Sequence, residues 1–183
     1  MEVIESKIPG VIIFQNEVYV DERGTFEETY SKNKLDRFGL DLDFVQDNRS
    51  KSLKKNTLRG LHLQEPPFDQ GKLVRCEKGA VFDVAVDLRM NSETYGLWVG
   101  VELAEGDGKQ FFVPSGFAHG FLTLEDHTVF TYKCSNYYHP QSEKALLWND
   151  PELGIDWPLS GEPILSFKDS QAPLLRNFET PFR

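Results

Sequence analysis

The segment from Gly79 to Arg89, GAVFDVAVDLR, most constrains the fold, because its side chains alternate in character with a period of two. Phe82, Val84, Val86 and Leu88 fall on one face of an extended chain, and Val81, Asp83, Ala85 and Asp87 on the other. This is the period of a β-strand, and Lys78-Gly79 supplies a turn before it. The segment therefore predicts a strand.

Most of the remaining chain also reads as short strands. In HTVFTYK, residues 127–133, Phe130 and Tyr132 lie opposite Val129 and Thr131. Further β candidates are residues 11–21, 24–30, 44–48, 72–77, 96–103, 109–114 and 120–124. Gly, Pro, Asn and Asp separate these segments, which is typical of a sandwich, jelly roll or barrel. Because aromatic residues lie on both faces of several strands, we expect an all-β, jelly-roll-like barrel whose lumen holds a ligand.

Helical signals are few. Ser31 is placed to cap a short helix that ends at Gly39, and a second short helical piece is expected near Leu174-Leu175-Arg176. The chain has no internal repeat, low-complexity tract or Pro/Ser-rich linker, so we expect one domain over residues 1–183.

Composition excludes several classes of protein. The chain has 183 residues, of which 29 are acidic and 20 basic, so its net charge is −9 and a general grip on nucleic acid is not expected. No apolar run approaches the length of a membrane span, and the N-terminal MEVIESKIPG lacks the apolar core of a signal peptide. Cys76 and Cys134 fit a reducing compartment rather than a disulfide framework. We therefore expect a soluble, cytoplasmic protein.

Polar groups crowd the apolar segment around His62. Arg59 precedes this histidine by three residues, Gln64 follows it by two, and Lys72 opens the next expected strand. A buried histidine taken alone is more often a hydrogen-bonded core residue than a catalyst. Several charged groups among apolar neighbours favour a site, because unpaired buried charge is costly.

A metal site has no positive support in the sequence. A cupin-type iron or manganese site usually has two histidines one residue apart, but the matching stretch here is His62-Leu63-Gln64. His119 is followed by Gly120-Phe121, which again supplies no paired ligand, and neither cysteine lies in a CxxC motif. We therefore expect no metal.

Acid–base and anion-binding groups are better supplied. Tyr132 lies on the same strand face as Phe130, so its hydroxyl enters the lumen if that face points inward; an ordinary core tyrosine is the competing interpretation. Asp169 is too distant in sequence for its spacing to establish a pairing with His62. Arg23 and Arg59 each precede a glycine, which favours the close approach of an anion such as phosphate.

Long segments resemble the dTDP-4-dehydrorhamnose 3,5-epimerase family. They include VDERGTFEETY, FVQDNRSKS, TLRGLHLQEPPFDQGKLVRCEKGAVFDVAVDLR, YGLWVGVEL, VPSGFAHGFLTL, YKCSNYYHPQSE and LLWNDPELGIDWP, and they run in one order from about Asp21 to Asp169. The resemblance implies a cupin jelly roll that acts as a homodimer without metal or cofactor.

The resemblance also implies roles for individual residues. His62 matches the catalytic base, Asp169 its partner, Tyr132 the general acid and Lys72 the cation that stabilises an enolate. Positions that match nucleotide and diphosphate contacts are Arg23, Glu28, Gln46, Asn48 and Arg59. Those that match further substrate contacts are His119, Glu143 and Lys168, and Tyr138 matches a residue that lines the substrate-binding site. Phe167 departs from the family, in which a polar residue is commoner at this position.

The implied activity is inversion of C3 and C5 of dTDP-4-dehydro-6-deoxy-D-glucose, giving dTDP-4-dehydro-L-rhamnose for dTDP-L-rhamnose biosynthesis. One alternative is an epimerase of a related dTDP-4-keto-6-deoxy sugar that acts at C3 or C5 alone, or a ketoisomerase. A cupin that only binds a nucleotide sugar or small anion, and a metal-dependent cupin oxygenase, are further alternatives. The missing paired histidine disfavours the oxygenase.

Overall fold

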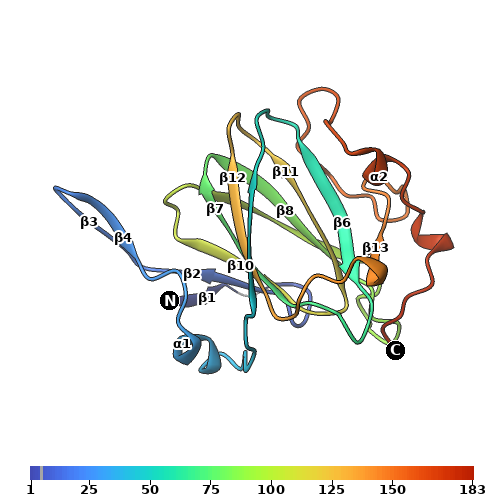
Figure 1. Ribbon diagram of the computed structural model, residues 1–183, viewed down its shortest axis with the longest axis horizontal. Helices are drawn as coiled ribbons and strands as arrows, with labels where there is room; N and C mark the ends of the chain where they lie inside the picture. The colour runs from blue at the N-terminus through green and yellow to red at the C-terminus, as the bar shows by residue number, and fades with distance from the viewer. Residues whose placement is uncertain (5) are drawn as a thin grey trace.

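The computed structural model describes residues 1–4 and 6–183 and consists mainly of two antiparallel sheets (Figure 1). The first sheet runs, in spatial order, β1 (Glu2–Ile4), β2 (Ile12–Gln15), β10 (Lys109–Val113), β7 (Lys72–Lys78), β12 (Val129–Cys134) and β5 (Gln46–Lys51). The second runs β13 (Glu143–Ala145), β6 (Leu58–Gln64), β11 (Phe117–Thr123), β8 (Ala80–Asp87) and β9 (Trp98–Ala104). The all-β, jelly-roll prediction is confirmed.

The two sheets face each other across a shared apolar core. Val74 of β7, Phe111 of β10 and Phe130 of β12 meet Val81 and Phe121 of the opposite sheet, and all five are buried. Aromatic and β-branched side chains suit these strands because they pack well on a pleated surface. The core lies between the sheets, so a ligand that enters there is contacted from both.

Strand β8 is buried on both of its faces. Val81 and Ala85 point into the core between the sheets, whereas Val84 and Val86 belong to a second apolar cluster. That cluster is covered by the C-terminal segment, which supplies Trp157 among others. The alternation therefore predicts the strand correctly. The face of β8 that carries Asp83 points into the core between the two sheets.

Short helices lie at the periphery, as expected. The first, α1 (Lys32–Asp36), follows Ser31, whose side chain makes no capping bond, and ends before Gly39 at a φ of 79°. The expected piece near Leu174 is the 3-10 helix η2 (Leu175–Asn177), and a second such turn is η1 (Pro140–Ser142). Helix α2 (Phe167–Ser170) has no counterpart among the expected elements.

A hairpin of β3 (Val18–Asp21) and β4 (Gly24–Glu27) extends away from the two sheets (Figure 1). The single strand expected over residues 11–21 is therefore wrong, because the chain leaves the first sheet after Gln15. The apolar part of that run is covered within the chain, since β1 and β10 flank β2 and Phe14 is buried.

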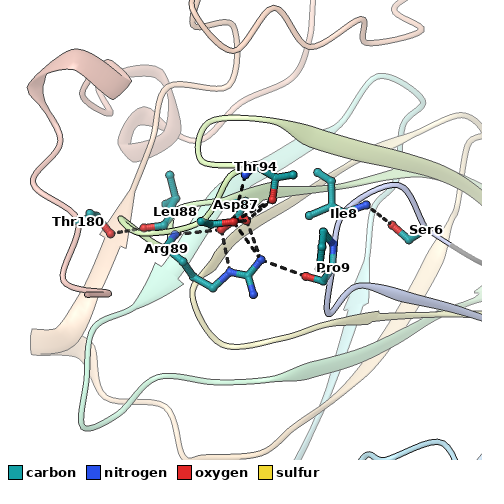
Figure 2. Close-up of polar contacts among 9 residues, drawn as sticks. Ser6, Ile8, Pro9, Asp87, Leu88, Arg89, Thr94 and Thr180 are labelled. Atoms are coloured by element: carbon teal, nitrogen blue, oxygen red, sulfur yellow. Dashed lines mark hydrogen bonds and ion pairs between the residues drawn. The ribbon is translucent and has the colours of Figure 1, made fainter.

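The end of β8 is tied to both ends of the chain (Figure 2). The buried carboxylate of Asp87 accepts hydrogen bonds from Arg89, Ser92 and Thr94. Arg89 also donates to the carbonyl of Pro9 at 3.0 Å, and Thr180 donates to the carbonyl of Leu88. These bonds fasten the outer segments against the barrel.

No helix among the described residues has the length and apolar character needed to cross a membrane.

Candidate active site

A cavity of about 550 Å³ lies between the sheets and is lined by residues of both. A smaller cavity of about 90 Å³ shares His62, Lys72, Tyr132, Tyr138 and Glu143 with it. Of the residues predicted from sequence, the larger cavity brings together His62, Lys72, Tyr132, Asp169, Arg59, His119, Tyr138, Glu143 and Lys168, and the smaller one adds Gln46 and Asn48. These side chains come from six strands, one helix and a loop.

His62 and Asp169 form a direct pair at the cavity wall. Nε2 of His62, on β6, lies 2.6 Å from Oδ1 of Asp169, on α2. Burial alone raises the pKa of Asp169, but the hydrogen bond and charge of His62, with donors from Gly60 and Ser166, outweigh burial and lower it. The carboxylate is therefore negative at neutral pH. It orients the imidazole with a proton on Nε2, which leaves the lone pair of Nδ1 available.

Helix α2 carries Asp169 because of a local cap. The hydroxyl of Ser166 accepts a hydrogen bond of 3.1 Å from the backbone N–H of Asp169, three residues on. The sequence Ser166-x-x-Asp169 has the spacing of a capping box, a signal that the sequence reasoning missed. Asp169 is 3% exposed, so its carboxylate reaches His62 with little competition from water.

Strands β6 and β11 approach closely beside this pair. Gly60 has a φ of 135°, and a Cβ added to it would lie 2.5 Å from the Cα of Gly120. Only glycine fits both the dihedral and the space. Two residues on, His62 stands directly opposite His119 in the antiparallel register.

Tyr132 faces the cavity from β12, on the sheet opposite His62. Burial raises its pKa, so the phenol keeps its proton well above neutral pH. The buried ring of Phe130 lies beside it, with centroids 5.9 Å apart, and also stacks near His119 at 6.3 Å. A protonated phenol on one wall thus shares the cavity with the imidazole of His62 on the other.

Lys72 brings a buried cation into the cavity. Burial lowers the pKa of its ammonium, while Cys134, Asp83 and Glu143 act in the opposite direction. Within residues 1–4 and 6–183, no carboxylate oxygen comes within 4.0 Å of this ammonium. Its charge is therefore available to an anionic atom of a ligand.

Asp83 is a buried partner of the cavity residue His119 that was not predicted from the sequence. Its carboxylate is fully buried on β8, 2.9 and 3.1 Å from Nε2 of His119. Burial raises the pKa of Asp83 despite this pairing. A carboxylate within a strand of Val and Ala was the available signal, because an acidic group is rarely buried without a partner.

A second group of polar contacts at the cavity is centred on Glu143, which pairs with Tyr138 and Lys168. The Tyr138 hydroxyl donates to Oε2 of Glu143 at 2.9 Å, and Nζ of Lys168 lies 2.5 Å from the same oxygen. Burial raises the pKa of Glu143, but its bonds from Lys168 and Tyr138 outweigh burial and lower it. Glu143 is therefore an anion that joins the Tyr138 loop to helix α2.

The amides of Gln46 and Asn48 line the smaller cavity from β5. Nε2 of Gln46 donates to Oδ1 of Asn48 at 3.0 Å, and Nδ2 of Asn48 donates to Sγ of Cys134 at 3.4 Å. Arg59 is exposed and lines the larger cavity. Its guanidinium therefore meets both solvent and cavity.

The structure does not bring Arg23 or Glu28 to this cavity within the chain. Arg23 lies in the turn of the β3–β4 hairpin, where its side chain is 86% exposed and pairs with Asp21. Glu28 follows the hairpin and pairs with Lys34 at 2.8 Å. The predicted site residues thus form two groups, one that lines the cavities and one at or next to the β3–β4 hairpin.

Among the residues that the structure describes, no three His, Cys, Asp or Glu side chains gather as a metal-binding group.

The comparisons with known proteins agree on one family. The family model described as dTDP-4-dehydrorhamnose 3,5-epimerase matches residues 5–177. The dTDP-4-dehydrorhamnose 3,5-epimerase of Salmonella typhimurium is 53% identical over 176 residues, covering 96% of this chain and 96% of that protein. These matches span nearly the whole chain.

Solved structures agree as well. The dTDP-6-deoxy-D-glucose-3,5-epimerase of Legionella pneumophila, in complex with dTDP-4-keto-L-rhamnose, superposes with a TM-score of 0.94 at 46% identity, covering 97% and 94% of the two chains. A 3′-monoepimerase of Streptomyces bikiniensis in complex with dTDP-quinovose gives a TM-score of 0.88 at 34% identity, covering 93% and 86%. The resemblance inferred from sequence is confirmed: the chain belongs to the dTDP-4-dehydrorhamnose 3,5-epimerase family.

Proposed function

We propose that this protein inverts C3 and C5 of dTDP-4-dehydro-6-deoxy-D-glucose to give dTDP-4-dehydro-L-rhamnose, for dTDP-L-rhamnose biosynthesis. The observation that carries the proposal is the pairing of a histidine base and a protonated tyrosine on opposite sheets of one cavity. Inversion requires a proton to leave one face of the ring and another to return on the opposite face. A base and an acid on opposing walls meet that requirement.

The C4 ketone acidifies the C–H bonds at C3 and C5. His62, oriented by Asp169, removes a proton, and the negative charge that grows on the C4 oxygen is stabilised by the ammonium of Lys72. Tyr132 returns a proton from the other wall. Each acid–base group contributes about 10²- to 10⁴-fold to such a reaction. Neither carbon ends with a changed oxidation state, so the reaction itself consumes no oxidant or reductant.

The remaining cavity residues hold the substrate in this proposal. Arg59, at the exposed edge of the cavity, contacts the diphosphate. Gln46, Asn48 and Tyr138 contact the nucleotide, while His119, Glu143 and Lys168 contact the sugar and its neighbouring groups.

The hairpin supports a homodimer as the working form. Val20 is 75% exposed and Phe26 is 70% exposed, which is unusual for apolar side chains on a projecting hairpin. A second copy of the chain covers this surface and receives Arg23 and Glu28 at its own nucleotide site. One domain over residues 1–183 then makes one half of the dimer.

A cytoplasmic location fits the free thiols. Cys76 and Cys134 are both unbridged and buried. A reducing compartment maintains cysteines in this state.

Exchange with deuterated solvent tests the proposed reaction. Purified protein incubated with dTDP-4-dehydro-6-deoxyglucose in deuterium oxide is expected to incorporate deuterium at both C3 and C5, read position by position by proton NMR. Incorporation at one carbon alone indicates the single-centre epimerase, for which the Streptomyces bikiniensis relative is a precedent. Incorporation at neither carbon by folded protein contradicts both readings. His62→Ala is the matched control, because it is expected to lose exchange while still binding dTDP.

A further inference from the structure

The side chain of Gln64 forms hydrogen bonds with the main chain on both sides of Tyr138. On one side, Nε2 of Gln64 donates to the carbonyl of Tyr137 at 3.2 Å. On the other, the backbone N–H of His139 donates to Oε1 of Gln64 at 2.9 Å. The same Nε2 also donates to the carbonyl of Phe68. One buried amide therefore fixes the residues before and after Tyr138.

The segment around Tyr138 is held mainly by side-chain contacts rather than by regular secondary structure. Residues 137–139 belong to no helix or strand, so no ladder of backbone hydrogen bonds fixes their dihedral angles. Tyr138 is 54% exposed and Tyr137 is 65% exposed, so core packing does not fix them either. Besides Gln64, the N–H of Tyr138 donates to Oε1 of Gln46 at 2.9 Å. His139 in addition stacks on the ring of Phe68, with centroids 3.7 Å apart, and contacts the hydroxyl of Ser142 at 2.9 Å. For the main chain directly before and after Tyr138, the amide of Gln64 supplies the tertiary hydrogen bonds.

The amide chemistry of Gln64 suits this task. The side chain must accept from one N–H and donate to two carbonyls, and only a neutral amide of this length does both. Glutamate at neutral pH would point a carboxylate at those carbonyls, and methionine would make none of the bonds. Gln64 is 5% exposed, so water does not replace a lost bond readily. In a cupin metal site this position carries the second histidine, and here its polar groups serve a loop instead.

We propose that Gln64 is a positioning residue for substrate binding, which acts by holding Tyr138 over the mouth of the cavity. This inference rests on the proposed function, in which Tyr138 contacts the nucleotide. The chain of contacts runs from Gln64 to the Tyr138 loop and then, through the Tyr138 hydroxyl, to Glu143. Gln64 lines the smaller cavity together with His62 and Tyr132, and the hydrogen bonds of its amide go to the main chain of Phe68, Tyr137 and His139.

A double-mutant cycle with Tyr138 tests the inference. Gln64→Met is expected to raise both the KM of the dTDP-sugar and the Kd of dTDP by about tenfold, and to change kcat by less than about threefold. Tyr138→Ala is expected to raise the same constants. In the Tyr138→Ala background, Gln64→Met is expected to add less than about twofold, because the residue through which it acts is gone. Equal effects in both backgrounds overturn the inference, as does an unchanged Kd.

Amide hydrogen exchange and a second substitution distinguish a loss of loop placement from other causes of a raised Kd. Amide hydrogen exchange at residues 137–139 is expected to accelerate in Gln64→Met and to stay at the wild-type rate in Gln141→Met, which changes an exposed glutamine nearby. If Gln64→Met does not fold, Gln64→Glu keeps the size and the acceptor, and the same rise in Kd is expected at neutral pH. If wild-type protein binds dTDP without epimerising, the proposed function fails while the Kd and exchange data still decide the role of Gln64.

Discussion

The carboxylate of Asp169 lies 2.6 Å from the imidazole of His62 although 107 residues separate them in the sequence. The pair forms because the Ser166 cap turns helix α2 toward β6, whose N–H at Gly60 also donates to Asp169 at 3.4 Å. A buried carboxylate with a lowered pKa gives the imidazole a fixed tautomer and stabilises its protonated form.

The first prediction concerns this pair. Asp169→Asn is expected to lower kcat by about 10²-fold or more, because the amide neither fixes the tautomer of His62 nor stabilises the imidazolium. The Kd of dTDP, measured by calorimetry, is expected to stay within about twofold, since the proposed function assigns no nucleotide contact to this pair. A wild-type kcat in Asp169→Asn would show that His62 needs no orienting carboxylate.

The second prediction concerns Lys72. Lys72→Met keeps the aliphatic length but removes the buried ammonium, so kcat is expected to fall by about 10²- to 10³-fold. Deuterium exchange at C3 and C5 should slow by the same factor, because the cation acts on the enolate that precedes exchange. A variant that loses turnover but keeps exchange would place the role of Lys72 after enolate formation.

The third prediction concerns the hairpin. If Arg23 contributes to the cavity of a second copy, a mixed dimer can be made from one chain with Arg23→Ala and one chain with His62→Ala. One of its two cavities then contains both native residues. Each variant alone is expected to be impaired, and an equal mixture after subunit exchange is expected to recover about one quarter of wild-type sites. Recovery is measured by turnover at limiting substrate. No recovery, with mixed dimers demonstrated by mass spectrometry, contradicts the shared site.

The fourth prediction concerns stability below neutral pH. Hydrogen bonds from Arg89, Ser92 and Thr94 outweigh the effect of burial and lower the pKa of Asp87 from 3.8 to about 2. Because the folded-state pKa is depressed, its stabilisation is present above about pH 4 and is lost as the pH falls through about 2. The group contributes about 2 kcal/mol to the free energy of unfolding at pH 7.

Urea unfolding of Asp87→Asn at pH 7 and pH 3 measures this contribution. The variant is expected to be less stable than wild type at pH 7, with a smaller difference at pH 3. Asp156 provides the control, since Asp156→Asn removes an exposed carboxylate. A constant difference between wild type and Asp87→Asn at both pH values would contradict the assigned pKa.

The sequence predicts the fold well where one strand face differs from the other. Phe130 and Tyr132 alternate with Val129 and Thr131, and β12 follows that alternation into the cavity. The sequence does not reveal that β8 is buried on both faces, because the cover for its second face comes from the distant segment around Trp157. An alternation with a period of two identifies a strand. Which segments cover each face of that strand depends on tertiary contacts.

The candidate site is predictable only in part for a similar reason. The resemblance supplied His62, Asp169, Tyr132 and Lys72, whereas spacing alone did not pair the first two. Asp83 was missed because its partner, His119, lies on another strand. Gln64 was noted only as a polar neighbour of His62, because its hydrogen bonds reach the main chain around Tyr138, far along the sequence. Strand register and loop closure bring these hydrogen-bonded residues together. Neither can be read from the residues that adjoin them in the sequence.

The buried ring of Phe130 has a consequence for the reaction. It lies between the sheets, 4.2 Å from the ring of Phe121 on the opposite one, and beside Tyr132. The gap between the walls that carry His62 and Tyr132 is therefore set by apolar packing, with Phe130 as a spacer. A core substitution such as Phe130→Leu is expected to change that separation while leaving the side chains of His62 and Tyr132 in place. The apolar core, and not the polar residues alone, therefore determines how far apart the two walls of the cavity stand.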